Sequence, residues 1–280
     1  MKKMRFLNRT MPKIGMGTWY MGEGKSPYVD ELRSLRTGIE QGIQLIDTAE
    51  MYGEGLAEQL VGDAISHYSR EQLTIVSKVY PWNATKDQMQ ISLENSLRRL
   101  KTDYLDLYLL HWREDVPLEQ SVEALERLRD QGKIRSWGVS NYDVADMEEL
   151  QLITNECATN QVLYHLGSRG VEFGLKPLMD ELNMPLMAYS PLGHGEHAKH
   201  LFQQHPVILD IAKKYEVTIQ QVLLAWVVAQ EHVMAIPKAS SSKHMKANLL
   251  AAQLTFEKED LQKLNEAFPA PSKKVPLDEL

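Results

Sequence analysis

The stretch IQLIDTAEMYGEG, residues 43–55, is the segment around which the rest of the chain is organised. Its apolar run ends in Asp47, and Tyr52 follows five residues later, just before two closely spaced glycines. This pattern predicts a short buried strand that delivers its last residue to a turn. An acid and a phenol then share an irregular segment, where side chains converge on ligands. A structural interpretation stays open, in which Asp47 and Glu50 form a capping box and Tyr52 packs at an amphipathic rim.

Apolar runs and amphipathic segments alternate eight times along the chain. Strands are expected at 14–19, 43–49, 73–79, 104–112, 134–141, 159–165, 184–192 and 233–238. Helices are expected at 29–41, 56–68, 87–100, 118–131, 143–153, 174–183, 206–215, 218–230, 242–252 and 257–267. The alternation predicts parallel β–α–β units, and no linker rich in Pro and Gly separates two halves. We therefore expect an α/β protein with a single (β/α)8 TIM-barrel domain over residues 1–280.

The two ends of the chain add to this barrel. Residues 4–11 alternate around an Asn-Arg-Thr turn and are expected to form a β-hairpin. Additional helices are expected near the C-terminus, followed by an extended tail over residues 269–280 that is rich in Pro and charge. A doubly wound sheet would need a glycine-rich fingerprint after its first strand, but Gly15, Gly17 and Gly22 lack that spacing.

Composition limits the partners and the compartment. Apolar residues make up 43% and charged residues 25% of the 280 residues, as in ordinary soluble globular proteins. The net charge of −7 argues against a general attraction to nucleic acid or acidic membranes. The single cysteine, Cys157, forms no internal disulfide and is expected to be a small packing residue in a reducing compartment. Without a signal peptide or a membrane span, a cytoplasmic location is expected.

Polar or charged groups recur at the ends of the predicted strands. They are Asp47, Lys78, His111, Ser140, Asn141, Gln161, Tyr189, Ser190 and Lys238. Successive groups from Asp47 to Asn141 stand roughly 30 residues apart, the length of one β–α–β unit. The carboxyl ends of barrel strands surround one mouth, where the chemistry of this fold takes place. The sequence therefore predicts a functional site at that mouth.

The residue types at these ends indicate proton transfer rather than metal chemistry. Lysine seldom coordinates a metal, and no serine nucleophile with a base is evident. A free phenol has a pKa of about 10, which a nearby ammonium lowers. Asp47 would keep Lys78 charged, and His111 would orient a carbonyl or share the proton. Such a group of side chains would protonate a carbonyl oxygen that receives a hydride, and no side chain supplies a hydride, so a nicotinamide is implied.

At these residues the chain resembles the aldo-keto reductase superfamily over nearly its whole length. The similar segments, in the family's order, are GMGTW, IDTAEMYGEG, VSKV, DYLDLYLLHW, GKIRSWGVSN, NQVLYH, AYSPLG and AIPK. The resemblance implies that Tyr52 is the general acid, that Lys78 and Asp47 tune it, and that His111 positions the carbonyl. Within the family, LIDTAEMY, SKVYPWNA and QVLYHLGSRG are similar to bacterial reductases of methylglyoxal and related small aldehydes.

The resemblance also implies how the nicotinamide end of NADPH is held. Ser140, Asn141 and Gln161 match the positions that bind the carboxamide, and Tyr189 matches the ring that stacks on the nicotinamide. Further cofactor contacts at this end are expected from Gly17, Thr18, Trp19 and Asp47.

At the phosphate end, Ser190 and Leu192 match contacts to the pyrophosphate, and Lys238 and Asn248 match the clamp on the adenosine. The family often has Ser and Arg in this clamp, where the present chain has Ala239 and His244. A 2′-phosphate needs donors and positive charge, and a helix N-terminus beside His244 favours anions. Because histidine is charged only when protonated, we expect a pH-dependent preference for NADPH, with weaker binding of NADH.

Aromatic residues are expected to wall the substrate pocket. They are Trp19, Tyr20, Tyr80, Trp82 and Trp112, although ordinary core packing is an equal alternative for Trp82. The substrate loop that the family carries at its C-terminus is short here, which favours small carbonyl compounds over steroids.

Three interpretations follow. The first is a monomeric, NADPH-dependent reductase of small aldehydes or ketoaldehydes. The second is a lyase or aldolase that uses Lys78 as a Schiff base. The third is a cofactor-sensing partner subunit, as in the channel-associated branch of the family, which keeps the same four residues. A metal site at His194, His197 and His200 is not expected, because no acid or cysteine completes the set.

Overall fold

The structure is a computed structural model that describes the backbone of residues 1–280 and every side chain except that of His197. Eight parallel strands form one sheet in sequence order. They are β3 (Met16–Gly17), β4 (Leu45–Asp47), β5 (Thr74–Val79), β6 (Leu105–Leu110), β7 (Ile134–Ser140), β8 (Asn160–Leu163), β9 (Leu186–Tyr189) and β10 (Val233–Ala235). Each strand is short and almost wholly buried, as apolar runs between two layers of side chains should be.

Backbone contacts between the first and last strands close this sheet into a barrel. Ile14 bridges Ala235 and Gly17 bridges Lys238, both in the parallel sense. The N–H of Gly17 donates to the carbonyl of Pro237 at 3.1 Å. The (β/α)8 barrel expected from the alternating pattern is thereby confirmed.

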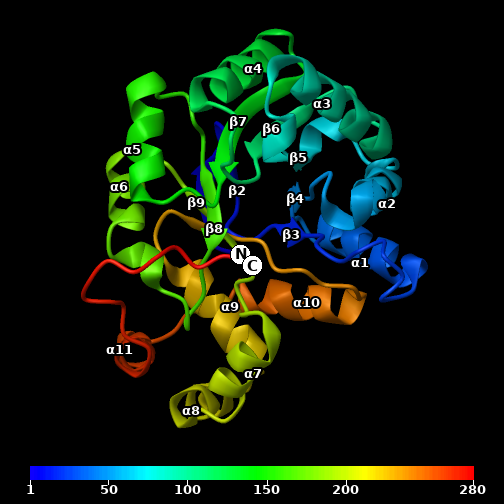
Figure 1. Cartoon of the computed structure of the whole chain (residues 1–280). Coiled ribbons are helices and arrows are strands. Elements are labelled where there is room, and N and C mark those ends of the chain that lie inside the picture. The colour runs from blue at the N-terminus through cyan, green and yellow to red at the C-terminus, as the bar shows by residue number, and fades with distance from the viewer.

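Helices surround the barrel on the outside (Figure 1). They are α1 (Tyr28–Glu40), α2 (Leu56–Ile65), α3 (Lys86–Leu100), α4 (Leu118–Asp130), α5 (Val144–Ile153), α6 (Leu175–Glu181), α7 (Gly195–Gln203), α8 (Pro206–Lys214), α9 (Ile219–Ala229), α10 (Ser242–Ala251) and α11 (Lys258–Ala267). Local sequence fixes several starts: Asp143 with Asp146 and Thr218 with Gln221 form capping boxes before α5 and α9. None of these helices has the length and apolar character of a membrane span.

The barrel has an inner and an outer apolar layer. The inner one, between the strands, contains Leu45, Val76, Leu107, Leu109, Met187, Met234 and Ile236. Phe6 and Met11 of the N-terminal hairpin, β1 (Lys3–Phe6) and β2 (Arg9–Pro12), join the same cluster. The predicted hairpin is therefore confirmed, and it closes the amino end of the barrel. The outer layer fills the space between strands and helices.

Two segments differ from the expectation. Helix α7 lies where only a loop was expected, and its buried Ala198 and Phe202, four residues apart, pack one face against the outer core. Residues 269–280 form no helix or strand, as expected, but they run back across the carboxyl end of the barrel (Figure 1). The mouth is therefore framed by the strand ends, by the β9–α7 connection and by the tail.

Candidate active site

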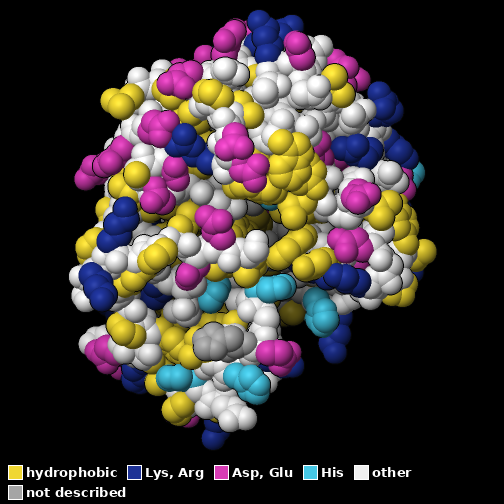
Figure 2. All heavy atoms as spheres, viewed as in Figure 1, with side chains coloured by type: hydrophobic (Ala, Val, Ile, Leu, Met, Phe, Trp, Pro, Cys, Tyr) yellow, Lys and Arg dark blue, Asp and Glu magenta, His cyan; other side chains and the backbone are white. Residues whose placement is uncertain are grey.

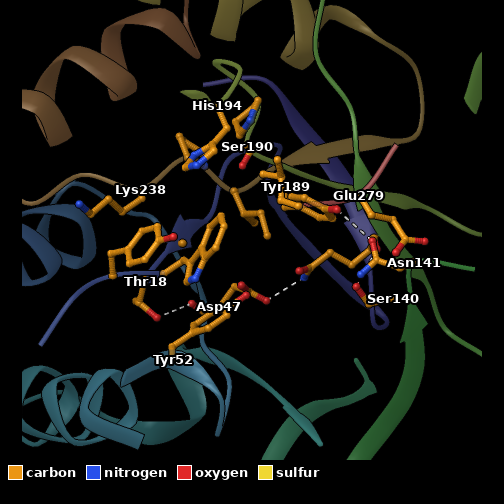
Figure 3. Close-up of a pocket in the computed structure, with 18 of the residues that line it drawn as sticks. Thr18, Asp47, Tyr52, Ser140, Asn141, Tyr189, Ser190, His194, Lys238 and Glu279 are labelled. Atoms are coloured by element: carbon orange, nitrogen blue, oxygen red, sulfur yellow. Dashed lines mark hydrogen bonds between the residues drawn. The ribbon is translucent and has the colours of Figure 1, made fainter. Parts of the chain in front are cut away.

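The buried side chains of Asp47, Tyr52, Lys78 and His111 meet at the base of the mouth. Figure 3 labels Asp47 and Tyr52. Asp47 ends β4, Lys78 lies in β5, and His111 follows β6, as the strand-end pattern predicts. The Lys78 ammonium donates to both carboxylate oxygens of Asp47 at 2.9 Å and to the Tyr52 hydroxyl at 3.0 Å. It also donates to the carbonyl of Thr48 at 2.9 Å. The phenol is thus connected to the acid through the lysine.

A tight turn places Tyr52 in this group. Tyr52 begins a 3-10 helix, η1 (Tyr52–Gly55), in which Gly53 and Glu54 adopt φ angles of 57° and 53°. Gly55 has φ 91°, and a Cβ there would lie 2.5 Å from the Arg99 side chain. Glycine avoids both the left-handed strain and that overlap. The GEG sequence after Tyr52 therefore returns the chain toward the barrel wall.

The capping-box interpretation of Asp47 and Glu50 is wrong. The carboxylate of Glu50 accepts from the backbone N–H of Tyr80 at 2.8 Å and from the Asn83 amide at 3.3 Å. Asp47 is bound to Lys78 instead. Glu50 fixes the loop after β5, while Asp47 belongs to the site.

Burial sets the protonation states. It raises the pKa of the Tyr52 phenol well above its ordinary value, and the nearby charge of Asp47 raises it further. This direction is opposite to the expected lowering by Lys78, because the desolvation of a phenolate dominates. Burial also lowers the pKa of Lys78, and Asp47 opposes that change. The phenol is therefore protonated and able to donate.

His111 is held as a neutral imidazole. Burial first, and then the charge of Lys78, place its pKa well below the ordinary value. Its ring meets the Tyr52 ring edge-on, with centroids 5.9 Å apart. Within the described side chains, its buried Nδ1 atom has no hydrogen-bond partner. A neutral histidine beside a protonated phenol can bind a carbonyl oxygen from two directions.

A cavity of about 480 Å³ opens above these residues. The strand-end residues predicted for the cofactor and brought together in its lining are Gly17, Thr18, Trp19, Ser140, Asn141, Gln161, Tyr189, Ser190, Leu192 and Lys238. Gln161 donates its amide N–H to Asp47 at 2.8 Å, and the Tyr189 hydroxyl donates to the side-chain amide oxygen Oδ1 of Asn141 at 3.0 Å. Polar side chains and the rings of Trp19 and Tyr189 thus line the cavity between the buried Asp47–Lys78 pair and Lys238.

Backbone strain gathers in the same lining. Asn141 and Ser190, which follow β7 and β9, adopt φ angles of 57° and 46°. Left-handed conformations are uncommon for residues other than glycine and concentrate at functional sites. No sequence pattern indicated this strain, because Asn-Tyr and Ser-Pro contain no glycine.

Only three of the five aromatic residues predicted to line the substrate pocket do so. Trp19, Tyr20 and Trp112 line the cavity. Tyr80 and Trp82 are not among the lining residues: their rings stack at 4.3 Å, and both meet Trp112 edge-on. They contact Trp112 outside the lining, and Trp82 is an exposed residue.

The predicted adenosine clamp is only partly in this cavity. Lys238 lines it, whereas His244 and Asn248 lie on α10 outside the lining. Ser241 caps α10 by accepting from the N–H of His244 at 3.3 Å. His244 is exposed in the first turn, and the Asn248 side chain is buried.

Several lining residues were missed from the sequence. They are Met51, Pro191, Gly193, His194, Ile236, Pro237, Glu279 and Leu280. His194 stacks on Trp19 with ring centroids 5.3 Å apart, which joins the β9–α7 connection to the loop after β3. Residues 279 and 280 carry no local signal that would place them at the mouth.

The prediction that His194, His197 and His200 bind no metal includes one side chain, that of His197, which the structure does not describe. Among the side chains that the structure describes, no three His, Cys, Asp or Glu residues are grouped as ligands. The side chain of His197 lies outside that set.

Comparison with known proteins gives a consistent result. The sequence model of the Aldo/keto reductase family matches residues 13–268. The chain is 49% identical to methylglyoxal reductase YeaE of Escherichia coli, over 96% of this chain and 95% of that protein. It is 33% identical to a glyoxal reductase of Bacillus subtilis, over 91% and 88%.

Solved structures agree with these relatives. A Klebsiella pneumoniae aldo/keto reductase crystallised with NADP and acetate is 48% identical, with a TM-score of 0.96, and the match covers 100% of this chain and 99% of that one. A Klebsiella pneumoniae aldo-keto reductase in complex with NADPH is 47% identical, with a TM-score of 0.96 and full coverage of both chains.

Proposed function

The chain belongs to the aldo/keto reductase family and is an oxidoreductase, and from this premise we propose that it reduces small aldehydes and ketoaldehydes to alcohols with NADPH. One observation carries the proposal: a protonated, buried Tyr52 is bound to a Lys78–Asp47 ion pair directly beneath the cavity. The similarity to a methylglyoxal reductase and a glyoxal reductase supports substrates of that size.

The cavity lining suits a nicotinamide cofactor. Amide groups of Asn141 and Gln161 offer donors and acceptors, Tyr189 offers a ring, and the Lys238 ammonium offers a charge for phosphate. The complexes of similar Klebsiella proteins with NADP and NADPH support this choice. When bound, the cofactor supplies the hydride.

The side chains of His111 and Tyr52 bind and protonate the carbonyl oxygen of the substrate. Neutral His111 and the Tyr52 hydroxyl bind the carbonyl oxygen, and the Tyr52 O–H proton passes to it as the alcohol forms. The negative charge left on the phenol oxygen lies 3.0 Å from the Lys78 ammonium, which stabilises it. Asp47 holds that ammonium in place and keeps it charged. Because Lys78 is engaged in these bonds as an ammonium, its use as a Schiff-base nucleophile has no support.

Preference for NADPH over NADH is assigned to Lys238, with His244 and Asn248 as the further members of the clamp. The Lys238 side chain lines the cavity, and burial of part of it lowers its pKa. His244 in the first turn of α10 lies where backbone N–H groups favour an anion. We further propose a monomer, because one chain supplies every member of the site.

Replacing Tyr52 by Phe tests the proposal. The change keeps the ring and removes the proton, so turnover of methylglyoxal should fall by about 10²–10⁴-fold, while NADPH affinity stays the same. Absorbance loss at the NADPH band measures turnover, and fluorescence titration measures affinity. Tyr68→Phe removes a hydroxyl that binds Glu40 far from the cavity, and it should leave turnover unchanged. Wild-type turnover in the Tyr52 variant would overturn the role of general acid.

A further inference from the structure

The tail segment, residues 274–280, is fastened to the rim of the mouth. Lys274 approaches Asp143 at 3.8 Å, and the Ser168 hydroxyl donates to the carboxylate of Asp278. Val275 packs on Gly170 so closely that a Cβ there would lie 2.9 Å from it. These contacts explain how residues far from any strand come to line the cavity.

Glu279 is the charged residue that this segment brings to the lining. It lies at the rim beside Asn141 and Tyr189 (Figure 3). Burial is the first cause of the raised pKa of Tyr189, and the negative charge of Glu279 is the second. The Glu279 carboxylate therefore lies close enough to affect a side chain of the cavity lining. Burial also raises the pKa of Glu279 itself. Within the described part of the chain, its carboxylate has no ion pair or hydrogen bond.

The four side chains at the base of the cavity carry no net charge. Lys78 and Asp47 form an ion pair, and Tyr52 and His111 are uncharged. Arg113, in the loop after β6, is bound by Asp146 and Glu149. Figure 2 shows acidic side chains on the rim of the hollow. The substrate end therefore carries excess negative charge, while Lys238 provides positive charge at the opposite end.

We propose that Glu279 selects against carbonyl substrates that carry a carboxylate or phosphate, so that the enzyme acts on neutral small aldehydes and ketoaldehydes. This inference rests on the proposed reductase function and specifies its substrate class. A negative substrate group entering beside an unpaired carboxylate is repelled, whereas a neutral one is not. The phosphates of the cofactor avoid the same repulsion because they are expected at the Lys238 end.

An isosteric pair of aldehydes tests the proposal: 4-nitrobenzaldehyde is neutral and 4-carboxybenzaldehyde is an anion. The readout is the ratio of the two kcat/KM values, compared between variants. Glu279→Gln should lower the neutral-to-anion ratio by roughly threefold to tenfold, as expected for one partly screened charge, and Glu279→Lys should lower it further. The change in the ratio should come from a higher kcat/KM for the anionic aldehyde, with the neutral aldehyde as the internal reference.

A control variant and a change in salt concentration distinguish the effect of the Glu279 charge from general effects of a charge change. Glu259→Gln removes one exposed charge on α11, outside the lining, and should leave the ratio unchanged. Raising the salt concentration screens exposed charges, so the wild-type ratio should fall and the Glu279→Gln ratio should stay constant. An unchanged ratio in both Glu279 variants would overturn the inference alone. Absence of NADPH consumption with every aldehyde would overturn the reductase function and this inference with it.

Discussion

At the scale of single residues, the site depends on one buried ion pair. Lys78 and Asp47 are almost wholly removed from water, with exposed side-chain fractions of 0% and 2%. Burying two charges is costly. The pair holds only because the three N–H bonds of the Lys78 ammonium point to the Asp47 carboxylate, the Thr48 carbonyl and the Tyr52 hydroxyl, and Asp47 also accepts from Gln161. The same pair serves folding and chemistry, so the two roles have to be separated by experiment.

Lys78→Met should lose both roles. It leaves Asp47 as an uncompensated buried carboxylate, so the free energy of unfolding should fall by about 3–5 kcal/mol. Turnover should also collapse, because no ammonium then stabilises the charge on the Tyr52 oxygen. Adding Asp47→Asn should restore most of the stability but not the turnover. Urea unfolding and NADPH consumption measure the two effects, and recovery of turnover in the double variant would contradict the role given to Lys78.

Residue identities at the site were predictable, but their protonation states were not. Asp47, Lys78 and His111 each follow or end an apolar run, and their spacing matches the barrel unit. The pKa of Tyr52 depends instead on how completely surrounding atoms exclude water, and no sequence pattern reports that. The sequence therefore predicted Tyr52 as the proton donor but gave the wrong direction for its pKa shift.

At the scale of elements, strands and capped helices were predictable because hydrophobic period and capping residues are local. Helix α7 was not, because Gly193, His194 and Gly195 resemble a loop. The apolar positions of Ala198 and Phe202, four apart, were the signal available. Phe202 meets the His165 ring edge-on at 5.8 Å, so α7 also buries the histidine that follows β8.

This contact makes stability sensitive to acid. Burial lowers the pKa of His165 to about 4. Between pH 6.5 and 4 the unfolded chain binds a proton on this histidine and the folded chain does not, so stability falls as the pH falls. His165→Gln cannot bind that proton, and its unfolding free energy should decline less over this window. Urea titrations at each pH measure the difference, with exposed His67→Gln as the control. Parallel curves for wild type and His165→Gln would contradict this account.

At the scale of the whole molecule, barrel closure and tail placement are long-range events. The sequence predicted the number and order of strands, but not that residues 279 and 280 return to the mouth. A polar tail has no hydrophobic period, and its position depends on contacts with Asp143, Ser168 and Gly170, roughly 100 residues earlier in the chain. The only sequence signal of barrel closure is the pair of glycines at the first strand, Gly15 and Gly17. These two glycines alone do not distinguish a closed barrel from an open sheet.

Gly17 is the position where closure can be tested. A Cβ on Gly17 would lie 2.6 Å from the backbone oxygen of Ile236, so β3 and β10 would have to separate. Gly17→Ala should therefore destabilise the protein by about 1–3 kcal/mol, and it should weaken NADPH binding because Thr18 and Lys238 flank this seam. A Cβ on Gly15 would instead meet the flexible tip of the Leu45 side chain at 2.6 Å. Gly15→Ala should cost less stability and leave NADPH affinity nearly unchanged. Thermal unfolding and fluorescence titration of both variants measure these effects, and equal losses in the two would show that closure at Gly17 does not position the cofactor.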